Sequence, residues 1–120
     1  MKKNTHMARR RMSHVIDELY TALFRMGGTE VDLQLRKEED GLRLTVRGDF
    51  PPENRKQMDR MAQMLQPAVR NRALVETYWE LAGGDHYTSD SELSLVGQML
   101  DEAQIEILDG EVRMVLYLAF

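Results

Sequence analysis

Residue types that can build a hydrolytic site gather in one polar segment, residues 85–90. Asp85, His86 and Ser89 are the types that supply an orienting acid, a general base and a nucleophile. Such chemistry also needs hydrogen-bond donors for a developing oxyanion, and the chain has no Gly-x-Ser-x-Gly sequence to provide them. Polar connections commonly contain these residues, so we interpret the segment as a loop and not as a catalytic site.

Metal-binding chemistry has little support in the sequence. The chain contains no cysteine, which excludes disulfides, thiolate metal sites and cysteine nucleophiles. His6, His14 and His86 are too far apart for a local metal motif, and no His-Glu-x-x-His, EF-hand or P-loop sequence occurs. We therefore expect neither a metal nor a cofactor.

The composition predicts one globular domain. The chain has 120 residues, of which 42% are apolar and 30% charged. No apolar run is long enough to span a membrane and no secretory signal follows the basic start, so we expect a cytoplasmic protein. Residues 1–11 hold five bases and no acid and are predicted to be a flexible tail, with residues 12–120 as the domain. The acidic remainder would repel a phosphate backbone, which argues against nucleic-acid binding through this tail.

Residues 12–26 are predicted to form the first helix, because apolar residues recur there at helical spacing. Ser13 is in a position to cap the start, and Gly27-Gly28 end the helix. The predicted buried stripe consists of Met12, Ile16, Leu19, Leu23 and Met26.

A hairpin should follow the first helix. Residues 31–36 and 42–47 alternate between apolar and polar types, and Asp40-Gly41 is a turn signal between them. One face of this hairpin is expected to be buried and the other exposed. The apolar positions are Val31, Leu33, Leu35, Leu42, Leu44 and Val46.

Three helical segments are expected next. The first begins after Pro52, and Pro67 separates it from a second over residues 68–82. Ser89 and Glu92 have the spacing of a capping box that opens the third. The apolar positions of the third helix are Leu93, Val96, Gly97 and Leu100.

A second hairpin completes the chain, with Asp109-Gly110 as its turn. Its last strand, residues 112–118, is apolar on both faces and is therefore expected to be central. The order α-β-β-α-α-α-β-β predicts a two-layer α/β sandwich of the α+β class. Its sheet should be mixed but mostly antiparallel, with about four strands covered by helices.

This order and two local stretches resemble the GHKL ATPase domain of bacterial histidine kinases and anti-sigma kinases. The stretch from Glu18 to Phe50 is similar to the N-box helix, two strands and G1 box of that family. The stretch from Leu93 to Asp101, with the two strands after it, is similar to the G2-box helix and the closing strands. The resemblance covers roughly two thirds of the chain and implies a histidine kinase ATPase-like fold.

The sequence departs from the family at the positions that the resemblance assigns to nucleotide and magnesium. Glu18 matches the N-box glutamate, but Ala22 stands where the family has a magnesium-binding asparagine, and a methyl group cannot coordinate a hard cation. Gly48 and Phe50 stand at the aspartate and the first glycine of the G1 box. Asp49 is one residue away, and a slip of one residue along a strand end points a side chain to the other face.

Two acids stand at the glycine positions of the G2 box, Asp90 and Glu92. The family's glycines let backbone N–H groups approach phosphates at a helix N-terminus, whereas carboxylates there would repel a triphosphate. The departures together predict a domain that no longer binds ATP, in which Glu18 is structural or a relic.

We therefore expect a non-catalytic regulatory or protein-interaction domain of bacterial signalling. One alternative is an active ATP-binding kinase or anti-sigma factor-type domain with an unusual pocket. Another is a phosphotransfer protein, because Ser13-His14 followed by Glu18 is similar to the phosphoacceptor segment of histidine kinases with three residues inserted. In that case His14 would accept the phosphoryl group.

The candidate docking surfaces for a protein partner are the sheet edge, the helices over residues 51–82 and a methionine-rich face, and two groups of residues stand out. Met58, Met61 and Met64 form a methionine-rich stretch of the kind that adapts to several partners, although their spacing also fits core packing. Tyr78 and Trp79 are the second group. The expected partner is a signalling or regulatory protein, and a homodimer is also compatible with the sequence.

Overall fold

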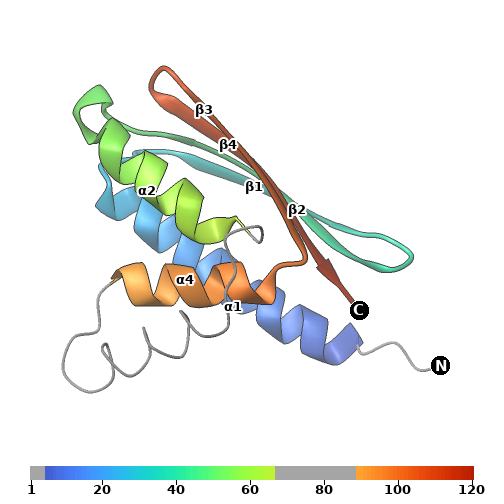
Figure 1. Cartoon of the computed structure of the whole chain (residues 1–120). Coiled ribbons are helices and arrows are strands. Elements are labelled where there is room, and N and C mark those ends of the chain that lie inside the picture. Colours follow the sequence, from blue (N-terminus) through green and yellow to red (C-terminus); the bar gives the residue numbers. More distant parts are fainter. Residues whose placement is uncertain (1–4, 67–88) are drawn as a thin grey trace.

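The described residues, 5–66 and 89–120, form two layers in the computed structural model of the chain. A four-stranded sheet is one layer, and helices on one of its faces form the other (Figure 1). The helices are α1 (Thr5–Arg25), α2 (Arg55–Leu65) and α4 (Ser89–Met99), with a short 3-10 helix, η1 (Pro52–Asn54), before α2. The strands are β1 (Val31–Lys37), β2 (Gly41–Asp49), β3 (Glu102–Leu108) and β4 (Glu111–Ala119).

The sheet has the strand order β1-β2-β4-β3, and each neighbouring pair is antiparallel. Each hairpin supplies two adjacent strands, and the hairpins join where β2 pairs with β4. β4 is therefore flanked on both sides, which confirms the central position predicted from its two apolar faces. The two-layer α+β class is confirmed, with an antiparallel sheet where a mixed one was expected.

The helix α1 begins earlier than its sequence pattern indicated. Thr5 already has helical backbone, so the prediction of a flexible tail over residues 1–11 is wrong from Thr5 onward. Ala8 is buried and extends the apolar stripe by one turn, and arginine is a good helix former. Ser13 consequently lies inside the helix, where its hydroxyl donates to the Arg9 carbonyl at 3.0 Å and caps nothing.

The end of α1 agrees with the sequence. Gly27 has φ of 96°, a left-handed conformation that side chains other than glycine rarely adopt. The Gly28 N–H donates to the Leu23 carbonyl at 3.0 Å, which satisfies one of the last carbonyls of the helix. This turn directs the chain back along α1 and into β1.

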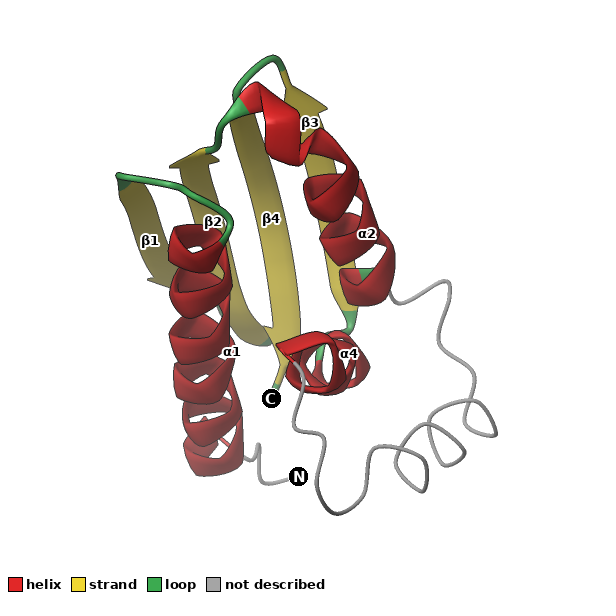
Figure 2. Ribbon diagram, turned by 90° about the vertical axis from the view of Figure 1, so that its left-hand side faces the viewer, coloured by secondary structure: helices red, strands yellow, loops and turns green. Residues whose placement is uncertain are grey.

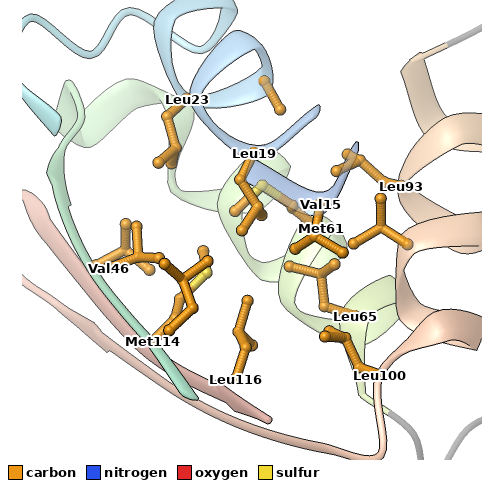
Figure 3. Close-up of a cluster of buried hydrophobic side chains, with 14 of the residues drawn as sticks. Val15, Leu19, Leu23, Val46, Met61, Leu65, Leu93, Leu100, Met114 and Leu116 are labelled. Atoms are coloured by element: carbon orange, nitrogen blue, oxygen red, sulfur yellow. The ribbon is translucent and has the colours of Figure 1, made fainter. Parts of the chain in front are cut away.

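One core joins the helices to the two central strands (Figure 3). Its labelled members are all 2% exposed or less, as expected of side chains held on several sides. They are Val15, Leu19 and Leu23 of α1, Val46, Met114 and Leu116 of the sheet, Met61 and Leu65 of α2, and Leu93 and Leu100 in and after α4.

The methionines of α2 belong to this core. Met58 is 0% exposed and Met61 is 1% exposed, so neither can present an adaptable surface to a partner. Met64 lies off the main stripe, as its spacing indicated, but it is half-buried and packs against the core. The helical spacing of these residues therefore reflects core packing, and the methionine docking surface is not present at Met58 and Met61.

The expectation of a buried face on the first hairpin is wrong for β1. Leu33 is 39% exposed and Leu35 is 50% exposed, although both point to the same face as the buried Leu44 and Val46 of β2. The reason is tertiary: α1 lies over β2, and β1 extends past the helical layer at the edge of the sheet (Figure 2).

Helices α2 and α4 pack closely because α4 has a glycine at the contact. A Cβ added to Gly97 would lie 2.3 Å from the Met64 carbonyl oxygen of α2. Only the absence of a side chain allows this approach, so Gly97 is a contact residue and not merely one position of the apolar stripe.

Several sequence predictions concern residues outside the described part of the chain. They are Pro67, the helix over residues 68–82 with Tyr78 and Trp79, and the loop from Asp85 as far as Thr88. In the described ranges, no helix has the length and apolar character needed to cross a membrane.

Candidate functional site

The position that the resemblance assigns to magnesium, Ala22, lies in a cavity between α1, α2 and α4. This interhelical cavity has a volume of about 290 Å³, near the lower bound of ligand pockets, which run from roughly 300 to 1,000 Å³. Its lining residues are Ala22, Arg25 and Met26 from α1 and the turn after it, Gln57, Arg60 and Met61 from α2, and Leu93 from α4.

The chemistry of the interhelical cavity does not fit a magnesium ion. Buried apolar side chains such as Ala22, Met61 and Leu93 line it on the inside, and the exposed Arg25 and Arg60 stand at its mouth. Among the lining side chains only a glutamine has an oxygen, and two guanidinium groups repel a cation. The cavity can accept an anion or an apolar side chain, but it has no donor set for a hard metal.

Glu18 and His14 lie on α1, one and two turns before Ala22. Glu18 is half-buried and interacts within the chain, but it is not among the residues that line the cavity. His14 is exposed, with its ring available to solvent. The structure therefore does not bring the candidate acid or the candidate phosphoacceptor into the cavity.

The G1-box positions are occupied by backbone and core. Gly48 faces the helices, and a Cβ there would lie 3.3 Å from the Leu23 Cδ1 atom. Phe50, at the first glycine position, is only 4% exposed and belongs to the core. Apolar side chains therefore fill the space at both positions.

Asp49 points to the opposite face of the sheet, as its offset of one residue predicted. Its carboxylate accepts hydrogen bonds from the Thr29 N–H at 2.9 Å, the Thr29 hydroxyl at 2.7 Å and the Glu30 N–H at 2.9 Å. These donors, the hydroxyl most of all, lower the pKa of Asp49 to about 2. Asp49 thus fastens the end of β2 to the turn after α1 and is not available to recognise an adenine.

The acids at the G2-box positions, Asp90 and Glu92, lie in the first turn of α4. Their side chains are outside the described part of the structure, so their repulsion of a triphosphate stays a prediction. α4 does begin at Ser89, the residue that opens the predicted capping box.

A second feature is an apolar surface beside the edge strand. A sheet edge was among the docking surfaces expected from the sequence, but none of the residues of this surface was identified there. Tyr20 and Phe24 are 38% and 47% exposed, and Leu33 and Leu35 are exposed to a similar degree. With the half-buried Ile16, these five residues are called the edge strip below. Large apolar side chains gathered on one surface mark a place where another molecule binds.

Helix α1 and strand β1 run in opposite directions at this margin of the molecule (Figure 2). Ile16 and Leu35 line one groove of about 290 Å³ between the two elements. A step of four residues along a helix is about 6 Å long, and a step of two residues along a strand is about 6.6 Å long, so the two elements advance at nearly the same rate. Tyr20 is therefore one step beyond Ile16 along α1, as Leu33 is one step beyond Leu35 along β1.

The aromatic part of the edge strip is ordered by contacts within α1. The rings of Tyr20 and Phe24 lie 6.2 Å apart at an interplanar angle of 71°, an edge-to-face pair. A hydrogen bond with Asp17 raises the pKa of Tyr20 and orients its hydroxyl. The sequence signal for this pair was its spacing of four residues on α1, displaced from the buried stripe.

The open face of the sheet has a different character, because several of its charges form ion pairs with one another. Arg47 bridges Asp32, at 2.9 Å, and Glu111. Arg43 pairs with Glu38 at 2.8 Å. Such exposed pairs contribute little to stability, and they leave a solvated surface of mixed charge.

One corner of that face is more strongly organised. The Tyr117 hydroxyl donates to Asp40 at 2.6 Å, and this carboxylate raises the pKa of Tyr117 to about 12. The Arg43 guanidinium lies 4.8 Å from the centre of the same ring. These contacts join β4 to the first hairpin, and we assign them a structural role.

Comparisons with protein-family models, with curated proteins and with solved structures found no match to this chain. No group of metal-ligating side chains occurs within residues 5–66 and 89–120. The candidate sites are therefore the interhelical cavity and the edge strip, judged on their own chemistry.

Proposed function

We propose that this chain is a non-catalytic protein-interaction domain of bacterial signalling, built on a histidine kinase ATPase-like fold that no longer binds ATP. The order of its helices and strands supports the resemblance drawn from the sequence. The surface that binds a protein partner is the edge strip.

The residues at the nucleotide positions support the loss of ATP binding. Ala22 offers a methyl group where a magnesium ligand is required, and Phe50 fills the first glycine position with a ring. Asp49, one residue after the position assigned to the adenine-binding aspartate, faces the other side of the sheet and accepts three hydrogen bonds. Several independent changes of this kind remove the metal ligand, the adenine acceptor and the space for phosphates.

The single observation that carries protein binding is the exposure of the edge strip. Tyr20, Phe24, Leu33 and Leu35 each leave more than a third of their surface in water. Burial of apolar surface contributes about 25 cal/mol per Å², so covering such a strip stabilises a complex substantially. Aromatic residues are also the type that most often dominates binding energy at protein interfaces.

Thermal unfolding with nucleotide tests the first half of the proposal. A ligand at a hundred times its dissociation constant adds about 2.7 kcal/mol to the free energy of unfolding. For a chain of this size that corresponds to a rise in Tm of roughly 10 °C. We expect no such rise with millimolar Mg-ATP or Mg-ADP, and a rise of several degrees that requires magnesium would overturn the loss of nucleotide binding.

Photo-crosslinking in living cells tests the second half. Phe24 is replaced by p-benzoylphenylalanine, with the same replacement of Gln104, an exposed residue of the far strand β3, as the control. We expect covalent protein adducts from position 24 that position 104 does not give. Adding Leu35→Asp should abolish them, because it places a charge in the same strip. If positions 24 and 104 give the same adducts, the edge strip is not a docking surface.

A further inference from the structure

β1 forms one edge of the sheet, so half of its backbone groups have no neighbouring strand. The Glu38 N–H donates to the Gly41 carbonyl at 2.8 Å, and hydrogen-bonded positions alternate along an antiparallel ladder. Even-numbered residues of β1 therefore point their backbone groups at β2. The backbone groups that face outward belong to Val31, Leu33, Leu35 and Lys37.

This edge is complementary to a second copy of itself. Two β1 strands can pair antiparallel about a twofold axis at Gln34, and that register brings all outward-facing residues opposite one another. Leu33 of each copy then faces Leu35 of the other on the side of the helices. Val31 faces Lys37, whose aliphatic stem can cover it while the ammonium group reaches water.

The same register aligns opposite charges on the open face. Asp32, which also bridges Arg47 of its own chain, comes to lie opposite Arg36 of the other copy, so the symmetry forms this second contact twice. Within the chain, Arg36 lies opposite Arg43 of β2, a like charge. Arg36 forms no ion pair with any described residue. Asp32 of a second copy would therefore give Arg36 the acidic partner that it lacks within its own sheet.

The helices would complete the interface. A twofold axis between antiparallel strands of one sheet is perpendicular to the sheet, so both α1 helices lie on the same side of the joint. Tyr20 and Phe24 of each copy then flank the leucines of the paired β1 strands. The edge strips of two copies would thereby cover one another.

The opposite edge of the sheet lacks these properties. β3 carries Glu102 and Glu106 and has no base, so pairing with itself would bring acids together without a compensating charge. The inner side of β3 is also covered, because α2 packs against it and Ile105 reaches the core. Self-pairing is favoured at β1 alone of the two edges.

From this complementarity we infer that the chain forms a twofold dimer in which two β1 strands pair antiparallel about Gln34 and the sheets join into one. The inference rests on the proposed function, that the edge strip is a protein-docking surface, and it names a second copy as the occupant.

Charge reversal with mixing of variants tests the register. Asp32→Arg places two arginines opposite each other in both symmetric pairs, and Arg36→Asp does the same with two aspartates. Each variant alone is expected to raise the dimer dissociation constant on the order of tenfold or more, because both pairs change from attraction to repulsion. An equimolar mixture of the two should recover the dimer, since every pair in the mixed dimer joins opposite charges.

Sedimentation equilibrium of the full chain, from micromolar to near-millimolar concentration, gives the readout. The control is Glu106→Arg on β3, which should leave the dimer unchanged. A wild-type chain that stays monomeric overturns the inference. So does an equimolar mixture whose sedimentation is the sum of the two separate variants, with no mixed dimer. Circular dichroism confirms that each variant is folded. If the chain is monomeric but photo-crosslinking from position 24 still gives adducts with another protein, the dimer is refuted and the proposed function is retained.

Discussion

Replacing Gly97 by alanine probes the contact that sets the distance between α2 and α4. The added Cβ would lie 2.3 Å from the Met64 carbonyl oxygen and 3.3 Å from the Leu65 Cα atom. Both neighbours are backbone atoms, so no side-chain rotation can relieve the contact. The two helices must move apart by roughly 1 Å before ordinary van der Waals distance is restored.

Two opposing effects determine the magnitude of the change. Alanine is better than glycine inside a helix by about 1 kcal/mol, which favours the variant. Overpacking costs typically 1–3 kcal/mol, and a gap of up to 1 Å forfeits about a quarter to a half of the dispersion energy across the helix interface. We expect the overpacking to win, with a net loss of about 1–2 kcal/mol in the free energy of unfolding. At roughly 4 °C per kcal/mol this lowers Tm by about 4–8 °C.

Calorimetry or circular dichroism melts of the wild type and Gly97→Ala give the measurement. The matched control is Gln98→Ala, the next residue of α4, which is half-buried and should change stability by no more than about 0.5 kcal/mol. A variant Gly97→Ala that melts at or above the wild-type temperature would refute the close packing of α2 on α4, and with it the dimensions of the interhelical cavity.

Two predictions concern titration. The pKa of Asp49 is lowered from 3.8 to about 2, so its stabilising contribution is present above pH 3.8 and is lost as pH falls through 2. The difference in free energy of unfolding between the wild type and Asp49→Asn, from urea titrations, should therefore shrink between pH 6 and pH 2.5; a constant difference would contradict this. Asp40→Asn should lower the pKa of Tyr117 from about 12 toward 10, because the carboxylate that disfavours the phenolate is removed. Identical phenol absorbance titrations of the two proteins would show that this hydrogen bond is not formed in solution.

Most of the fold follows from local patterns. The alternation in both hairpins predicted the four strands, the glycines after Met26 predicted the end of α1, and the apolar run of β4 predicted its central position. The structure has all three features. The start of α1 was misjudged because alanine and arginine between Thr5 and Met12 form a helix without an obvious apolar stripe. Burial of Ala8 depends on what packs against it, and periodicity does not reveal that.

Some features of the candidate sites could likewise be predicted from the sequence, and others depend on packing. The amino acids at Ala22 and Phe50 are enough to predict the absence of a metal ligand and of an open backbone at the positions that the resemblance assigns, since a methyl group or a ring has the same chemistry in any fold. The orientation of Asp49 could also be predicted, because side chains alternate along a strand.

Tertiary structure alone decided which apolar residues stay in water. Leu33 and Leu35 have the same alternating pattern as Leu44 and Val46, and the sequence does not distinguish the two strands. Their different exposure arises because one helix, α1, lies over β2 and leaves β1 at an uncovered edge. Burial is a property of the neighbours that the fold assembles, and for this reason the edge strip, and any partner that covers it, could be recognised only in three dimensions.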